Sequence, residues 1–146
     1  MAAFRFSLQQ VLDYREQLSE QARVELAKVT AAVISEERKV KELQEAIHTQ
    51  ETNLRALDLN NIGERWLLEN FIKGLQEDLR ISLAQLQTLQ NALKEAQGKV
   101  AQLAKEHKVL EKLKSKQAER HAKSERQKEQ QNYDETASIR FNSKTF

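Results

Sequence analysis

The stretch LDLNNIGERWLLENF, residues 57–71, interrupts an otherwise uniform chain. It holds one of the three glycines and the only tryptophan, and the 146-residue chain has no proline. Apolar residues recur with the spacing of a coiled coil on both sides of it. Asn60, Asn61 and Gly63 are residue types that tolerate left-handed or turn geometry and can cap helix ends. The stretch therefore predicts the turn of a helical hairpin.

The segment before the turn carries a seven-residue repeat. The first position of each repeat is apolar throughout and comprises Leu26, Val33, Val40, Ile47 and Leu54. The companion position, three residues later, comprises Val29, Glu36, Leu43, Gln50 and Leu57. An earlier apolar stripe consists of Phe4, Leu8, Val11, Leu18 and Ala22. We expect this stripe to join the repeat through one extra four-residue step, a stutter in the coiled coil.

The segment after the turn carries a stricter repeat. One position comprises Ile72, Leu79, Leu86, Leu93 and Val100, and the other comprises Leu75, Leu89, Ala96, Leu103 and Leu110. Ser82 and His107 are polar exceptions, and the apolar stripe ends at Leu113. Polar residues at Arg15, Glu36, Gln50 and Ser82 are expected to weaken the seam, the line of contact between the helices.

The two repeats predict an all-α fold, a long antiparallel two-helix coiled-coil hairpin whose second helix overhangs at its C-terminal end. With the turn centred near residue 61 or 62, facing residues have numbers that sum to about 123. Phe4 then faces a residue near 119, and later residues have no partner. The predicted single domain, 1–146, comprises a helix over about 3–58, a turn over about 59–64, a helix over about 65–131 and a frayed tail over 132–146.

Composition limits the compartment and the partners. The chain has no cysteine, which suits a reducing cytoplasm, and no apolar run long enough for direct membrane insertion. Its first residues do not resemble a secretory signal. Residues 1–111 hold 15 basic and 17 acidic residues, a charge of −2, whereas residues 112–146 hold 9 and 5, a charge of +4. The end of the chain is therefore basic.

No residue pattern indicates catalysis, a metal site or a cofactor. His48, His107 and His121 are far apart in the sequence and lack metal-ligand spacing. The three glycines are isolated, so no phosphate-binding loop is present. We expect that the protein is not an enzyme.

The basic segment over residues 112–131 has three interpretations. It is a solvated single helix, a docking surface for an acidic protein, or a nucleic-acid site. Glu119, Glu125 and Glu129 interleave with its cations, and the segment itself contains no Phe, Trp or Tyr, the first after it being Tyr133. Because single-stranded nucleic acids are bound largely by stacking on aromatic side chains, we expect no nucleic-acid partner.

Four stretches resemble the flagellar export protein family FliJ. They are FRFSLQQVLDYREQLSEQARVELA at residues 4–27, ERWLLENFIKGL at 64–75, LEKLKSKQ at 110–117 and YDETASIR at 133–140. Tyr133 departs from the leucine expected before the Asp-Glu pair. The resemblance covers the whole chain in the family's order and spacing.

The resemblance implies a non-enzymatic component of the bacterial flagellar type III export apparatus. Its fold would be similar to the stalk of rotary ATPases. It would bind and stimulate the export ATPase hexamer, contact the cytoplasmic domain of the membrane export gate and bind export chaperones. It would be cytoplasmic and peripheral at the inner membrane. An escort protein for export chaperones and a general coiled-coil adaptor without ATPase coupling are the alternatives.

The resemblance also implies two interfaces. The export-gate interface would comprise Phe71, Leu75 and Trp66. Phe71 and Trp66 could instead pack over the turn, and Leu75 lies on the seam by its heptad position. The ATPase-ring interface, nominated from the stalk analogy, comprises Phe4, Phe6, Leu8, Tyr14, Lys112, Lys116, Arg120 and Lys123. In the tail, Ile139, Phe141 and Phe146 are candidates for ordering on a partner.

Overall fold

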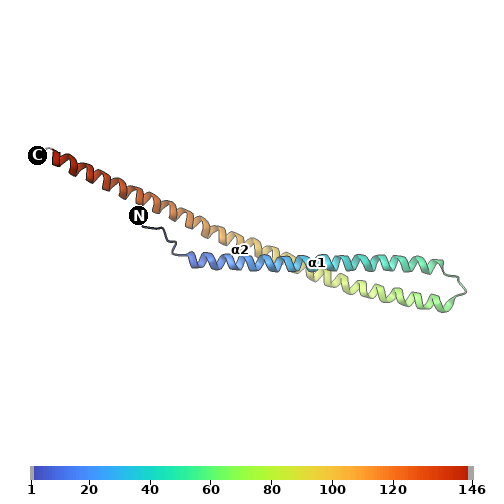
Figure 1. Ribbon diagram of the computed structural model, residues 1–146. Helices are drawn as coiled ribbons and strands as arrows, with labels where there is room; N and C mark the ends of the chain where they lie inside the picture. Colours follow the sequence, from blue (N-terminus) through green and yellow to red (C-terminus); the bar gives the residue numbers. More distant parts are fainter. Residues whose placement is uncertain (1, 145–146) are drawn as a thin grey trace. The chain divides into compact units, whose positions relative to one another are not determined.

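The computed structural model describes residues 2–144 and contains two helices (Figure 1). Helix α1 spans Gln9–Ala56, with 48 residues, and α2 spans Ile62–Lys144, with 83 residues. Within the described residues there is no strand. The prediction of an all-α helical hairpin is confirmed.

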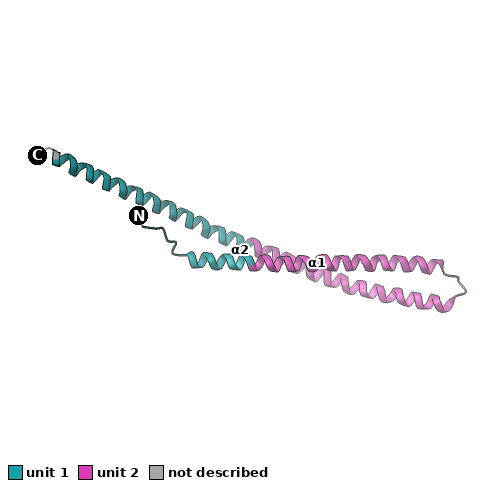
Figure 2. Ribbon diagram, viewed as in Figure 1, with its two compact units in different colours: residues 1–20, 102–146 teal, residues 21–101 magenta. Residues whose placement is uncertain are grey.

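The chain forms two compact units (Figure 2). One unit, which we call the turn unit, is Gln21–Ala101 and contains the connection between the helices. The other, which we call the terminal unit, combines Met1–Glu20 with Gln102–Phe146. In each unit a part of α1 lies antiparallel to a part of α2, because the chain reverses at the turn.

The turn occupies residues 57–61, slightly earlier than the predicted 59–64. The amide of Asn61 donates to the carbonyl of Asp58 at 3.0 Å, and the amide of Asn60 donates to the Asp58 side chain at 3.3 Å. The carbonyl of Asn61 accepts the first bond of α2, from the amide of Arg65 at 3.1 Å. No described residue has a positive φ, so the turn uses side-chain and capping hydrogen bonds instead of left-handed geometry.

The seven-residue register of α1 runs without a stutter. Leu12 and Ser19 are buried and precede Leu26 by fourteen and seven residues, so the first position of the repeat extends back to Leu12. Leu8 and Val11, which the expected stripe included, are exposed. The predicted stutter is therefore wrong. It arose because Ser19 is polar and does not signal a seam position in the sequence.

Helix α1 begins at Gln9 instead of near residue 3. Phe6 is buried and Phe4 is half-buried, although they are two residues apart. A helix would place residues at this spacing on nearly opposite faces, whereas a non-helical segment can turn both toward the same neighbour. The packing of the two phenylalanines thus explains the late start of the helix.

The seam of α2 continues past its last apolar residue. Ser82 is the most deeply buried side chain, with 1% of its surface exposed, as expected for a small residue on the seam. After Leu110 the heptad positions are taken by half-buried polar residues, Lys114, Gln117 and His121. Leu113, where the sequence placed the end of the stripe, is exposed and lies off the seam.

Helix α2 continues to Lys144 instead of ending near residue 131. Most of the segment that was expected to fray is therefore helical. The side chains of residues 130–143 are all exposed there. The segment contains no proline or glycine to end the helix. Phe146, named above for ordering on a partner, lies outside the described residues.

Two glycines inside α2 give a first prediction. A Cβ atom built on Gly74 or on Gly98 meets nothing within 4 Å, and neither residue has a positive φ. Replacing both by alanine should raise the free energy of unfolding by about 1–2 kcal/mol and the melting temperature by a few degrees. Thermal unfolding followed by circular dichroism tests this, and a lower melting temperature would contradict it.

Candidate functional site

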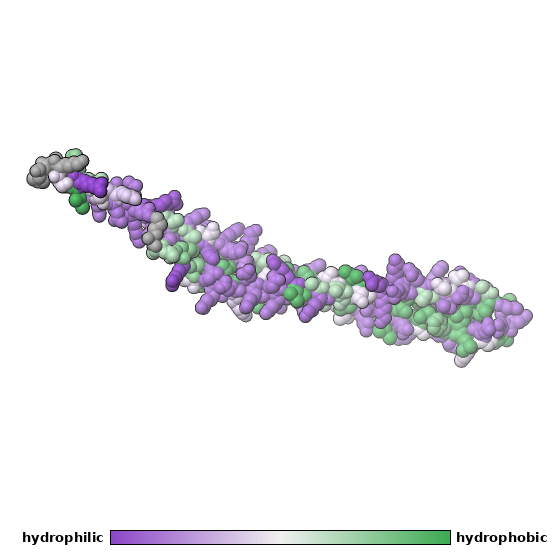
Figure 3. Space-filling view, viewed as in Figure 1, coloured by the Kyte–Doolittle hydropathy of each residue, from purple (hydrophilic) through white to green (hydrophobic). Residues whose placement is uncertain are grey.

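The largest gathering of exposed apolar side chains lies at the turn. We call it the turn patch, and its residues are Leu59, Ile62, Trp66, Leu67 and Phe71. Figure 3 shows hydrophobic surface concentrated over this end of the turn unit. Exposed apolar patches on soluble proteins are typical of interaction sites.

A shallow pocket lies within this region. It is lined by Leu57 from the turn and by Glu64, Leu67, Leu68 and Phe71 from α2. Glu64 and Phe71 are seven positions apart, and Leu67 and Leu68 each lie three or four positions from both of them, so the four residues share one helix face. Apolar side chains from the turn and from α2 therefore line this pocket together with one carboxylate.

The predicted gate residues divide between this patch and the seam. Phe71 is 54% exposed and Trp66 is 64% exposed, so the turn covers neither of them fully. Leu75 is half-buried at a seam position. The sequence analysis did not name Leu59, Ile62 and Leu67 as interface residues. They are apolar residues outside the heptad positions, and this feature could have identified them.

The N-terminal segment of the terminal unit packs on α2. The rings of Phe4 and His121 have centroids 5.7 Å apart, and Nε2 of His121 donates to the carbonyl of Ala2 at 3.0 Å. The side chain of Phe6 is buried. Phe4 and Phe6, which were nominated as ring contacts, thus hold the segment to the protein's own helix.

The other nominated ring-contact residues are accessible. Leu8 and Tyr14 are exposed on the first segment of the terminal unit. Lys112, Lys116, Arg120 and Lys123 are exposed on α2. Within the terminal unit, the structure therefore leaves the four cations and these two apolar residues available to a partner.

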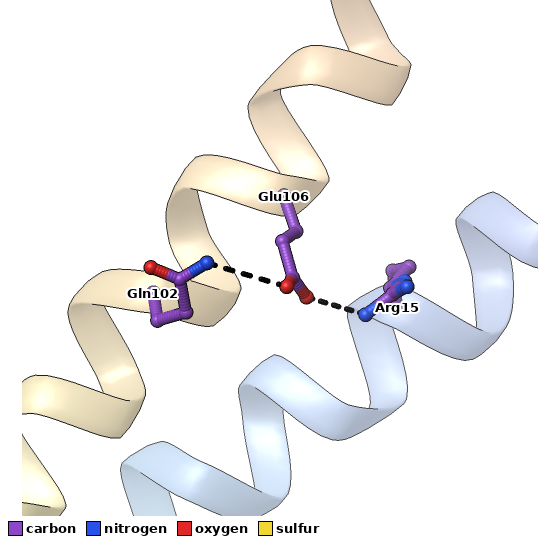
Figure 4. A network of polar contacts seen from close by, with 3 residues as sticks. All are labelled: Arg15, Gln102 and Glu106. Atoms are coloured by element: carbon purple, nitrogen blue, oxygen red, sulfur yellow. Dashed lines mark hydrogen bonds and ion pairs between the residues drawn. The ribbon is translucent and has the colours of Figure 1, made fainter.

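Arg15, a polar residue on the seam, has a partner (Figure 4). Its guanidinium forms an ion pair with Glu106 of α2, and Gln102 donates to the same carboxylate at 3.4 Å. Both charged side chains are about one-third exposed. The pairing offsets the cost of placing a cation at the seam and helps to fix the register of the terminal unit.

Two side chains in the turn unit have shifted pKa values, and they pair with each other on the protein surface. Arg80 donates to both carboxylate oxygens of Glu77, at 2.6 and 3.0 Å. This hydrogen bonding lowers the pKa of Glu77 and raises the pKa of Arg80. Because both groups lie open to solvent on one helix face, the pair is a local helix contact and not a site for proton transfer.

Neither a metal cluster nor a membrane span is found in the described part of the chain. Between residues 2 and 144, no three His, Cys, Asp or Glu residues gather in a way that could hold a metal ion. Neither helix, as far as it is described, has a stretch that is long and apolar enough to cross a membrane.

A comparison with protein families gives one match. The family described as "Flagellar FliJ protein" matches residues 4–145, which is nearly the whole chain. No curated protein and no solved structure matches the chain significantly.

Proposed function

The chain belongs to the flagellar FliJ family, which supports a role in flagellar protein export, and from this premise we propose that it acts as a stalk-like coupling factor. In this role it binds and stimulates the export ATPase ring and contacts the cytoplasmic domain of the export gate. The protein itself carries out no catalysis. It also binds export chaperones through its exposed helical surfaces.

The observation that carries the proposal is the difference in chemistry between two exposed surfaces. The turn unit presents the turn patch, and the terminal unit presents exposed cations on α2. A coupling factor needs two such surfaces because it must bind two partners at once. Buried apolar contacts supply affinity, and charge complementarity supplies orientation and rate of association.

The turn patch has the exposed aromatic side chains that a binding surface for the gate needs. Phe71 and Trp66 are aromatic and largely exposed, and Phe71 lines a shallow apolar pocket. Aromatic side chains that fill a partner's pocket are typical of residues that dominate binding energy. Leu75 supports this contact from the seam, where it fixes the position of the α2 segment that carries Phe71.

The terminal unit has the exposed side chains and the single helix that binding to the ATPase ring needs. Tyr14, Leu8 and the cations of α2 are exposed there, and the helix continues past the N-terminal segment to Lys144. A single helix with every side chain exposed can enter a central opening that would exclude a helix pair. Phe4 and Phe6 contribute indirectly because they hold the N-terminal segment in place.

Deletion of residues 130–146 tests the ATPase role. All described side chains from 130 to 143 are exposed, so the deletion removes little packing within the protein. We expect stimulation of the purified ATPase to fall by about tenfold or more while the melting temperature stays within a few degrees. The measurement is ATP hydrolysis against added protein.

The control for this deletion is the substitution Tyr133→Ala in the full chain, which keeps the helix length. Full stimulation by the deleted protein, or no stimulation by the intact protein, would contradict the stalk role. In the latter case, retained binding to a purified export chaperone would favour the escort role instead.

A further inference from the structure

The last part of α2 carries a partly aromatic face on a single helix. We call it the tail face, and its residues, which line one shallow pocket, are Tyr133, Thr136, Ala137, Arg140 and Phe141. Each of them lies three or four positions from another, so all five share one side of the helix. Tyr133 is 72% exposed and Phe141 is 69% exposed. Exposed aromatic side chains beside a pocket are typical of a docking surface.

The tail is helical although its residues favour a helix only weakly. In residues 132–143, NYDETASIRFNS, nine of the twelve residues belong to the types with weaker helix propensity, against three of the eighteen in residues 114–131. All side chains from 130 to 143 are exposed, so packing within the chain contributes little there. Because a helix without packing is marginal in water, a helix at this place is best explained by packing on another surface.

The charges of the tail are divided along its length. Residues 129–135, which we call the acidic half, have a charge of −3 from Glu129, Asp134 and Glu135 and contain no basic residue. Residues 136–144, the basic half, have a charge of +2 from Arg140 and Lys144 and contain no acidic residue. The helix dipole does not explain the acidic half, because that half lies many turns after the start of α2.

This division of charge makes the tail complementary to a second copy of itself. An antiparallel copy places each acidic half against the basic half of the other chain. A parallel copy would instead place like charges together along the whole tail. The antiparallel arrangement also brings the aromatic residues at the two ends of the tail face toward each other. Ala137 lies between them, and its small side chain allows the two helices to approach closely.

We propose that the tail face docks on the tail face of a second copy of this chain, with the two helices antiparallel about a two-fold axis. Four aromatic side chains then bury on the order of 600–1,000 Å². This area is near the lower limit for specific interfaces, so the dimer is weak, with a dissociation constant of about 10–100 µM. Since the proposed function places the same single helix in the ATPase ring, this dimer is a form of the free protein.

The test is sedimentation equilibrium of the full chain between about 5 and 500 µM. The tail variant is Arg140→Glu, and the matched control is Arg38→Glu, at an exposed position of α1 in the turn unit. Each substitution changes the formal charge from +2 to 0. We expect the intact protein and the control to form the same dimer, and the tail variant to dimerise at least about tenfold more weakly. Circular dichroism checks that both variants keep their helicity.

A second variant tests whether the two halves contact each other. Asp134→Lys with Glu135→Lys replaces two exposed acidic residues, so the acidic half becomes basic. Alone, this double variant should also dimerise more weakly than the control. An equimolar mixture with the Arg140→Glu protein should restore association, because each altered half then meets the opposite charge. A folding defect in either variant would not be restored by mixing.

The outcomes leave the inference supported or overturned. A monomeric intact protein over the whole range would overturn it, and so would an absence of association in the mixture. Equal dimerisation of the Arg140→Glu and Arg38→Glu proteins would mean that the chains pair through another surface, such as the turn patch, or in parallel. That result also overturns the inference. The measurement uses this chain alone, so its result does not depend on whether the ATPase ring binds.

Discussion

Replacing Ile72 by alanine will lower the free energy of unfolding by about 2–4 kcal/mol. The Ile72 side chain is 6% exposed and occupies a heptad position in the turn unit. Its truncation removes buried apolar surface and leaves a cavity that the two helices can fill only in part. The melting temperature should fall by about 5–15 °C, which thermal unfolding followed by circular dichroism will show.

The adjacent substitution Phe71→Ala is the matched control for stability. Phe71 lies one residue earlier in α2 and is 54% exposed, so its truncation should change the free energy of unfolding by no more than about 1 kcal/mol. The helix propensity of alanine offsets part of the lost contact. Equal destabilisation by the two substitutions would show that Phe71 packs over the turn as a structural residue.

The same pair of variants separates packing from gate binding. We expect Phe71→Ala to weaken binding to the purified cytoplasmic domain of the gate by about tenfold or more, because an exposed aromatic anchor is lost. Titration calorimetry measures the affinity. Leu83→Ala, an exposed apolar residue of α2 outside the turn patch, is the control. Unchanged affinity for Phe71→Ala would exclude Phe71 as an anchor.

Replacing Glu36 by leucine will stabilise the protein by about 1–3 kcal/mol. Oε1 of Glu36 is buried and has no hydrogen-bond partner in the described structure. The residue lies on the seam between Val33 and Val40, both buried. Leucine at this position removes the cost of an unpaired buried oxygen and adds apolar contact. The melting temperature should rise by about 3–10 °C.

The control for this prediction is Glu37→Leu, at the next position of α1. Glu37 is exposed, so the substitution should change the free energy of unfolding by less than about 0.5 kcal/mol. A similar melting temperature for Glu36→Leu and the unsubstituted protein would mean that solvent reaches the Glu36 carboxylate in solution. Destabilisation would mean that the acidic side chain contributes a favourable contact.

The apolar repeats of the sequence predicted the main seam but not its full length. Leu26, Val33 and Val40 have the expected spacing and lie buried or half-buried. The seam positions Leu12 and Ser19 were missed because Ser19 is polar and hydropathy marks it as a surface residue, whereas Arg15 was correctly expected on the seam. Arg15 is tolerated there by its ion pair with Glu106, a contact between residues that are 91 positions apart.

The candidate surfaces were predicted in part. The aromatic cluster beside the turn was evident from the sequence, since Trp66 and Phe71 do not follow the heptad positions. The burial of Phe6 was not evident, because the sequence favoured helix at that position. The cations Lys112, Lys116, Arg120 and Lys123 were nominated from the sequence, and the structure shows that all four are exposed.

The sequence by itself determined the helical class, the hairpin and the place of the turn. These follow from local rules, namely a seven-residue apolar repeat, the absence of proline, and turn-forming residues at one position. The tertiary structure decided the start of α1, the exposure of each described aromatic residue, and the polar seam positions at Ser19, Lys114, Gln117 and His121. These depend on contacts between distant parts of the chain, such as Phe4 with His121, which no local pattern encodes.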